Sequence, residues 1–257
     1  MNSTVEEADF SIPKQESDKL YHYDGTIYEY LQENELHPDG VAFDSLLLLL
    51  NYPDSLFSSQ RDSLMNAQGK YTLFAVPDEG FAQAVKSMNI YRRLNNLTGQ
   101  DGDLSLTKLL QSRHVVYRSN PDSTELNPLP PTEVVFEYKH DLDSLSARYI
   151  FSGEVDTEFL FANQTDENYL VKECIRYGYR MSMGIERMAA SGVEDAGPKR
   201  FLFYDINNTL QSTKWDVSPV KWMDVYATNG VIHIMNPGHE FGYAEFVQRF
   251  KKYGHEE

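Results

Sequence analysis

The pattern of hydrophobic and polar positions divides the chain into a helix-rich first half and a strand-rich second half. In the first half, apolar side chains at helical spacing predict helices that begin at Thr26 and Pro77, and helices over 43–51, 54–65 and 104–111. Thr26 and Glu29 have the spacing of a capping box, which defines the start of the first helix. A run of β-forming residues over 71–76 predicts a strand before the helix at Pro77.

The second half of the chain alternates short candidate strands with loops. The predicted strands are 114–117, 133–138, 147–152, 158–162, 201–204, 222–226 and 231–235, and an amphipathic helix is predicted over 241–253. Four prolines between 121 and 131, and the stretch 191–198, indicate loops. Helices that gather early and strands that gather late are typical of an α+β fold, and no internal repeat divides the chain.

Three segments of this pattern carry motifs: 71–81, 109–116 and 227–235. In this order they resemble the strand-to-helix motif, the central His-Val-Val segment and the second motif of the fasciclin (FAS1) domain family. The segment 26–51 is similar to the helical lead-in of that family. The resemblance implies an α+β fold, a fasciclin-like β-sandwich wedge flanked by short helices, and it marks no catalytic centre.

The domain organisation follows from the spacing of these motifs. Residues 1–20 are polar, acidic and without periodicity, so we expect a flexible leader before a single fasciclin-like domain over 21–257. The leader fits an exported protein whose signal has been removed, and it fits an ordinary cytoplasmic N-terminus equally well. The stretch 118–220 is longer than the family carries there, so we interpret it as a long insertion of about 60 extra residues.

We expect the residues of the family motifs to be structural. They are Thr72, Phe74, Asp78, Phe81, His114, Asn229, Gly230 and His233. Asp78 is expected to cap the helix that begins beside it. Asn229 and Gly230 are expected to form a turn with positive φ before the last strand. His114 is expected to make a buried hydrogen bond that ties the central strand to the first motif.

Composition and charge exclude several classes of protein. The chain has 257 residues with 23 Lys and Arg against 39 Asp and Glu, a net charge of −16, which disfavours nucleic acid and anionic membranes as partners. An aromatic content of 13% excludes a disordered acidic chain. No apolar run reaches the roughly 18 residues of a membrane span. The single cysteine, Cys174, excludes an intrachain disulfide.

The sequence shows no established catalytic motif. It lacks Gly-x-Ser-x-Gly, His-Glu-x-x-His and a phosphate-binding glycine loop, and its seven histidines are scattered. Glycoside hydrolysis needs two carboxylates at a fixed separation in a cleft, and the proximity of Asp141/Asp143 or Asp122/Glu125 in the sequence does not show one. Cys174 lies among apolar residues, as expected of a small buried hydrophobe. We therefore expect no enzyme, no cofactor and no metal site, with a hydrolase as the least favoured alternative.

Aromatic side chains gather in and beside the predicted insertion. Such rings stack on sugars or anchor protein interfaces, and the candidate ligand-binding residues are Tyr169, Tyr177, Tyr179 and Trp215. The alternative role for these rings is to pack the insertion onto the domain. An exposed cluster would favour the first role.

The fasciclin resemblance implies a non-catalytic adhesion or binding module, extracellular or at the cell surface, with an extracellular protein or polysaccharide as its partner. Arg113 stands where animal members carry a tyrosine beside the histidine at His114, which argues against animal-type integrin recognition. The alternative is an accessory glycan-binding lipoprotein of a bacterial polysaccharide-uptake system, of the Bacteroides type. Such a protein would be anchored by lipid to the outer membrane, its export signal removed. The polar leader and the tyrosine-rich insertion favour this alternative.

Overall fold

The first and third motifs form two neighbouring parallel strands at the centre of the fold. These are β1 (Tyr71–Ala75) and β9 (Gly230–Met235), with Phe74 opposite His233. The computed structural model describes residues 22–165, 169–187, 199–209 and 211–255. The predicted leader and the predicted loop 191–198 lie outside these residues.

Five further strands extend the sheet on both sides of this pair. The order is β4-β1-β9-β8-β7-β6-β5, and every neighbouring pair except β1 and β9 is antiparallel. The added strands are β4 (Ile150–Ser152), β5 (Leu170–Glu173), β6 (Arg180–Arg187), β7 (Lys199–Asp205) and β8 (Asp216–Ala227). The stretch 118–220 thus supplies strands to the same sheet as the motifs, and its status as an insertion stays a prediction.

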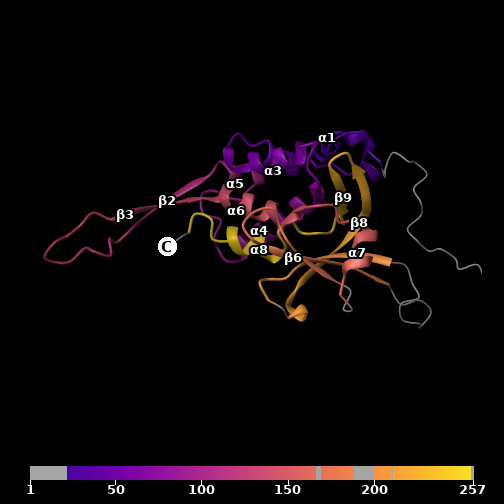
Figure 1. Cartoon of the computed structure of the whole chain (residues 1–257). Coiled ribbons are helices and arrows are strands. Elements are labelled where there is room, and N and C mark those ends of the chain that lie inside the picture. The colour runs from indigo at the N-terminus through magenta and orange to yellow at the C-terminus, as the bar shows by residue number, and fades with distance from the viewer. Residues whose placement is uncertain (1–21, 166–168, 188–198, 210, 256–257) are drawn as a thin grey trace, which may run out of the picture.

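Most of the helices gather on one side of this sheet, while α7 (Thr157–Asn163) lies apart from them against β6 (Figure 1). The others are α1 (Ile27–Gln32), α2 (Asp44–Leu50), α3 (Ser55–Met65), α4 (Asp78–Leu94), α5 (Leu106–Gln111), α6 (Tyr138–Ser146) and α8 (Tyr243–Phe250). Short 3₁₀ turns lie at Asn34–Leu36, Pro38–Gly40, Ala147–Tyr149 and Ser212–Lys214. The capping box at the start of α1 is confirmed, since Thr26 and Glu29 exchange both hydrogen bonds. Together these elements confirm the α+β class.

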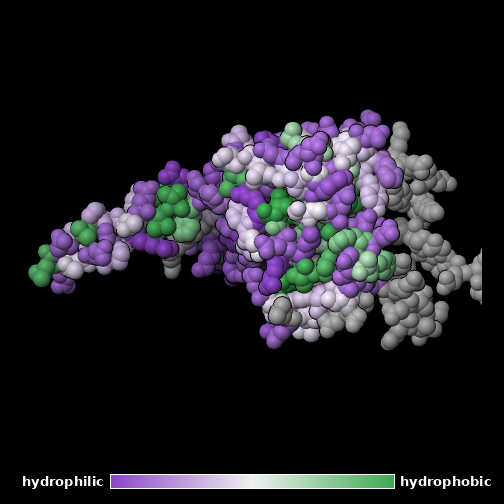
Figure 2. Space-filling model, viewed as in Figure 1, coloured by the Kyte–Doolittle hydropathy of each residue, from purple (hydrophilic) through white to green (hydrophobic). Residues whose placement is uncertain are grey.

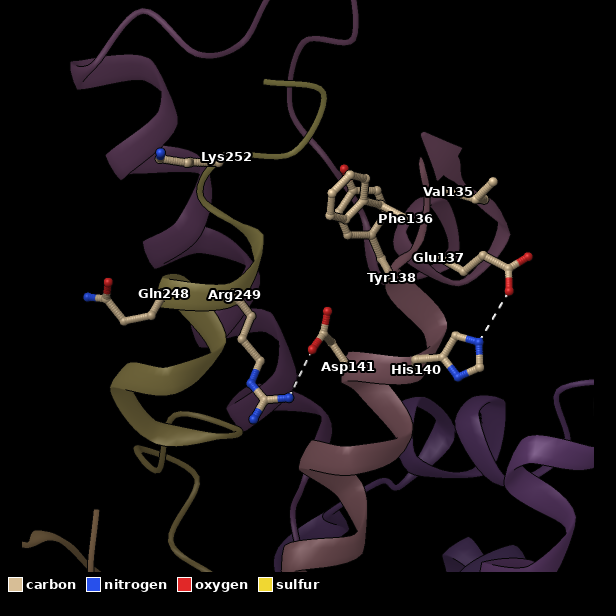
Figure 3. Close-up of a pocket in the computed structure, with 9 residues that line it drawn as sticks. All are labelled: Val135, Phe136, Glu137, Tyr138, His140, Asp141, Gln248, Arg249 and Lys252. Carbon is tan, nitrogen blue, oxygen red and sulfur yellow. Dashed lines mark hydrogen bonds and ion pairs between the residues drawn. The ribbon is translucent and has the colours of Figure 1, made fainter. Parts of the chain in front are cut away.

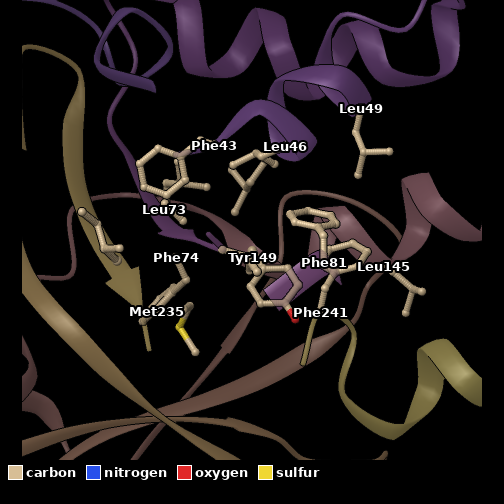
Figure 4. Close-up of a cluster of buried hydrophobic side chains, with 14 of the residues drawn as sticks. Phe43, Leu46, Leu49, Leu73, Phe74, Phe81, Leu145, Tyr149, Met235 and Phe241 are labelled. Carbon is tan, nitrogen blue, oxygen red and sulfur yellow. The ribbon is translucent and has the colours of Figure 1, made fainter. Parts of the chain in front are cut away.

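The hydrophobic core lies between the sheet and the helices (Figure 4). Phe74 of β1 stacks on Phe203 of β7 with ring centroids 4.1 Å apart. Phe81 of α4 stacks in the same way on Phe241, just before α8, at 4.2 Å. Rings from both halves of the chain therefore share one core, and burying rings of this size is among the largest stabilising contributions in a domain.

Two predicted secondary-structure elements are wrong. The segment 158–162, predicted as a strand, lies within α7, whose first turn is capped by the Asp156 carboxylate. An N-cap of this kind supplies the acceptor that free N–H groups of a helix need, and it favours the helix over a strand. The segment 147–152 is a strand only from Ile150, because Ala147–Tyr149 forms a 3₁₀ turn. Helix α6 was not predicted, since its first residue was assigned to a strand.

The predicted cap of α4 is also wrong. Pro77 occupies the N-cap position, and no side chain caps the helix. The Asp78 carboxylate instead accepts a hydrogen bond from the backbone N–H of Ser45, 2.7 Å away at the start of α2. The Asp78 N–H donates to the carbonyl of Ala42 at 3.0 Å. Asp78 therefore ties α4 to α2.

Candidate functional site

A hairpin projects from the body of the described chain (Figures 1 and 2). It consists of β2 (Arg113–Arg118), the loop 119–131 and β3 (Thr132–Glu137), and we call it the arm. Strand β2 pairs with β3 alone, and within the described chain β3 has no other strand beside it. Both outer edges of the arm are therefore free of strand pairing among the described residues.

The arm carries apolar side chains that lack cover from the body. Tyr117 is 68% exposed, Leu126 fully exposed at 100%, and Val135 40% exposed. Figure 2 shows hydrophobic residues at the far end of the arm and again near its base. Exposed apolar groups that cluster on one element, rather than scatter singly, are typical of an interaction surface.

The loop of the arm is held in shape by its own hydrogen bonds. The N–H of Ser123 donates to the carbonyl of Asn120 at 3.0 Å, and the N–H of Leu129 donates to the Ser123 hydroxyl at 2.9 Å. Thr124 and Asn127 exchange two backbone hydrogen bonds. Four prolines further restrict the loop backbone. A loop ordered in advance loses less conformational entropy when it binds.

A groove of about 460 Å³ lies where the arm meets the body, between the start of α6 and the end of α8 (Figure 3). Its lining residues are Val135, Phe136, Glu137, Tyr138, His140, Asp141, Gln248, Arg249 and Lys252. Across the groove the Arg249 guanidinium lies 2.9 Å from the Asp141 carboxylate, and His140 lies 3.2 Å from the Glu137 carboxylate. The groove thus joins an apolar wall from the arm to a charged wall from the two helices.

The four aromatic residues singled out in the sequence lie in two separate places, at opposite ends of β5. Tyr169 and Trp215 meet edge to face with ring centroids 4.9 Å apart, and Tyr204 also meets Trp215 edge to face, at 5.8 Å. Tyr177 and Tyr179 lie in the turn between β5 and β6. The structure therefore brings these residues together in pairs, and their role in binding stays a prediction.

Tyr177 is the most exposed of these four rings, half open to solvent. Its hydroxyl donates a hydrogen bond to the buried carboxylate of Asp143, and the Arg176 guanidinium lies 4.8 Å from its ring centroid. Partial burial, together with the bond to Asp143, raises the pKa of Tyr177 to about 12. Burial also raises the pKa of Asp143, against the lowering effect of Tyr177, Arg176 and Gln60. No local pattern in the sequence indicates this cluster, because Gln60 lies 83 positions from Asp143.

Tyr179 is held from two sides by arginines. The Arg148 guanidinium lies 4.2 Å from its ring centroid, and Arg249 donates to its hydroxyl at 2.8 Å. Burial acts to raise the pKa of Tyr179, but hydrogen bonds to Ser144, Arg148 and Arg249 lower it overall. Arg148 in turn forms a buried ion pair of 2.5 Å with Asp205. These contacts fix Tyr179 in place between the sheet and α8.

Most of the family-motif residues are buried, and their contacts are structural. The Thr72 hydroxyl donates to the carbonyl of Gly153 at 2.7 Å and accepts from the N–H of Val155 at 2.8 Å. His233 accepts at Nδ1 from the N–H of Asp224, and its Nε2 lies 2.7 Å from the carbonyl of Val155. Burial lowers the pKa of His233 and so favours its neutral form.

His114 is half-buried on β2 opposite Phe136 of β3, in the arm and not in the sheet that contains β1. The expected hydrogen bond between His114 and the first motif stays a prediction. Its neighbour Arg113 lies 3.5 Å from the carboxylate of Glu133, across the arm.

The described residues bring together no cluster that could hold a metal ion, and the candidate acids and the candidate thiol have other surroundings. Over residues 22–165, 169–187, 199–209 and 211–255, no three His, Cys, Asp or Glu side chains come together to hold a metal ion. Asp141 is paired with Arg249, while Asp143 is enclosed by Gln60 and Tyr177. Burial raises the pKa of the Cys174 thiol to about 12. Among the helices of the described chain, none is long and apolar enough to cross a membrane.

Comparison with known proteins supports the fold. No protein-family model and no curated protein matches the chain. A solved FAS1 domain pair from the insect cell adhesion molecule fasciclin I matches with a TM-score of 0.50 and 15% sequence identity. The match covers 87% of this chain and 52% of that one, so the chain spans about half the length of the solved pair. At this identity the likeness shows the fold alone, and the predicted fasciclin-like fold is confirmed.

Proposed function

We propose that this chain is a non-catalytic binding module that acts outside the cell or at its surface and recognises a protein through the arm. The observation that carries the proposal is the combination of open strand edges and exposed apolar side chains on one projecting, internally ordered element. Extended protein segments bind such edges by adding a strand, and exposed aromatic and aliphatic groups add affinity.

The description of the structural neighbour fits this proposal. The matching domain pair comes from a cell adhesion molecule, and adhesion is a binding function that needs no catalytic residues. The contacts of the nucleophile and acid candidates point the same way. Cys174 is buried with a raised pKa, and Asp141 is held in an ion pair with Arg249.

The second candidate function is glycan binding by a lipid-anchored surface protein of a bacterial polysaccharide-uptake system. The observation in its favour is the half-exposed ring of Tyr177, which lies beside the Arg176 guanidinium. An exposed ring with a neighbouring polar group is a suitable platform for a sugar. We place this function second because Arg176 already covers one face of the ring.

Two variants separate these functions. In the first, an Asn-Gly turn replaces loop 119–131, since Arg118 and Thr132 are paired and a two-residue turn can join them. In the second, Tyr177→Ala removes the exposed ring. Both variants and the unaltered chain are tested against immobilised matrix and surface proteins and against a polysaccharide panel.

The proposal predicts protein binding that is lost with the loop and kept in the Tyr177 variant. Binding to a polysaccharide at about millimolar sugar that is lost only in Tyr177→Ala would favour the second function instead. Binding to neither panel, with all three proteins folded, would contradict both.

A further inference from the structure

We infer that two copies of this chain pair through the outer edge of β3, so that their arms lie side by side in opposite directions. In this arrangement the loop 119–131 of each copy reaches the groove at the base of the other arm. The inference rests on the proposed function, because it takes the arm as the binding element and names a second copy as its occupant.

The open edge of β3 is the first argument. Strand β3 is bonded to β2 alone within the described chain, and a two-stranded ribbon is marginally stable in water. An unpaired strand edge is a template for another strand. Pairing of two β3 edges would convert each ribbon into half of a four-stranded antiparallel sheet.

Charge selects one register for this pairing. The two-fold axis that relates two antiparallel strands is perpendicular to their sheet. Each residue of one copy therefore lies opposite a residue of the other copy whose side chain points to the same face of the sheet. With Val134 opposite Val134 of the second copy, Glu133 lies opposite Val135, and Thr132 lies opposite Phe136. Sliding by one pair in either direction places Glu133 opposite Glu133 or opposite Glu137 of the second copy. Like charges directly opposite are unfavourable, so the Val134-centred register is preferred.

The same register carries the loop of one copy to the groove of the other. In this register Thr132 of the second copy lies opposite Phe136 of the first copy. The loop that precedes Thr132 in the second copy therefore extends towards the start of α6 and the end of α8 of the first copy. The loop brings the carboxylates of Asp122 and Glu125 together with exposed Leu126.

The receiving surface complements this loop in charge. Lys252 lines the groove and Lys251 precedes it, while the carboxylates in the groove already have partners. Asp141 is paired with Arg249, and Glu137 lies within 4 Å of both Lys139 and His140. An acidic loop with an apolar tip therefore fits the groove.

Sedimentation velocity of the full chain at physiological salt tests the inference. We expect a monomer–dimer equilibrium, with a dissociation constant raised at least about tenfold by Val134→Lys, which places a charge on the two-fold axis. Val116→Lys is the matched control. Val116 is paired with Val134 on the same face but lies on β2, one strand away from the edge, so the dimer should be retained.

A charge reversal tests the contact between loop and groove. Glu125→Lys should weaken the dimer, Lys252→Glu should weaken it similarly, and the double variant should recover most of the loss. A monomer up to about 100 µM, or a dimer unaffected by Val134→Lys, would overturn the inference. Loop-dependent binding to an immobilised protein by a strictly monomeric chain would leave the proposed function standing while removing this inference.

Discussion

The side chain of Asn229 holds the first helix of the domain to the turn between the last two strands. Its Oδ1 atom accepts a hydrogen bond from the backbone N–H of Ile27 at 2.8 Å, across 202 positions of sequence. Its Nδ2 group donates to the carbonyls of Leu64 and Asn66, at 2.8 and 3.2 Å. One fully buried amide thus joins the start of α1, the end of α3 and the β8–β9 turn.

Asn229→Ala should destabilise the domain by about 3 kcal/mol, because it removes the hydrogen-bond partner of the buried Ile27 N–H and of the buried Leu64 carbonyl. Urea unfolding followed by circular dichroism measures this change. The matched control is Asn163→Ala, whose exposed amide donates within its own helix to the carbonyl of Phe159. The control should cost less than about 1 kcal/mol, and equal losses in the two variants would contradict the role given to Asn229.

Gly230→Val should be the more damaging change in the same turn. Gly230 has φ of 149°, and a Cβ atom there would lie 1.9 Å from the carbonyl oxygen of Tyr71. The two central strands would have to separate, so we expect a loss of about 4 kcal/mol or failure to fold. Gly102→Val is the control, since Gly102 also has positive φ but open space around it. A control as harmful as Gly230→Val would show that φ alone, and not the contact with β1, is decisive.

The stability of the domain should fall as the pH falls below about 6.5, partly through His239. This imidazole is buried and bonded to the Tyr149 hydroxyl at 2.8 Å, and burial lowers its pKa to about 3. At a pH between about 3 and 6.5, the imidazole of His239 is protonated in the unfolded chain and neutral in the native state. The free energy of unfolding should therefore drop by about 1 kcal/mol per pH unit for this residue. His233 acts with the same sign.

His239→Gln should flatten this dependence, which urea unfolding between about pH 4.5 and 7.5 would measure. Asp143 acts with the opposite sign, because a raised native pKa adds stability at low pH that is lost as the pH rises through it. Comparing the variant with the unaltered chain cancels this contribution. An identical slope in the two proteins would rule out His239 as a source of the acid sensitivity.

Cys174 should be unreactive in the native protein. The thiol is buried, lies 3.4 Å from the carbonyl of Arg148, and has a pKa raised to about 12 by burial. Since the thiolate is the reactive form, Ellman's reagent should label it only as fast as the domain opens. Labelling should be complete at once in denaturant. Rapid labelling of the folded chain would contradict the buried position.

Local signals in the sequence were sufficient for the helical first half. Thr26 and Glu29 specified a cap that depends on residues three positions apart, and Pro77 marked the start of α4. The same local reasoning failed at 158–162, where a short apolar run fits a strand and a helix equally well. The Asp156 carboxylate favours the helix, because it accepts a hydrogen bond from the N–H of Phe159 at 2.7 Å and so caps the first turn.

Contacts between residues that lie far apart in the chain could not be predicted from the sequence. Asp143 looked like a surface acid, yet it is buried because Gln60 and Arg176 come to it from other elements. The exposure of the arm could not be predicted from the sequence either. The short apolar run of Val115, Val116 and Tyr117 fits a buried strand, and only the packed structure shows that the body leaves Tyr117 open.

The central claim, that the arm is the binding element of this module, is tested most directly by removing its exposed side chains without disturbing the fold. Tyr117 and Leu126 are largely or wholly exposed, so Tyr117→Ser with Leu126→Ser should leave the melting temperature nearly unchanged. The control is Leu94→Ser, at a 79% exposed leucine at the end of α4, which is not part of the arm.

Binding to the immobilised protein panel, followed by biolayer interferometry, is the measurement. The structure predicts that the Tyr117/Leu126 variant loses binding by at least about tenfold while Leu94→Ser binds as the unaltered chain does. Equal binding by all three proteins would contradict the claim and would place the functional surface elsewhere on the domain.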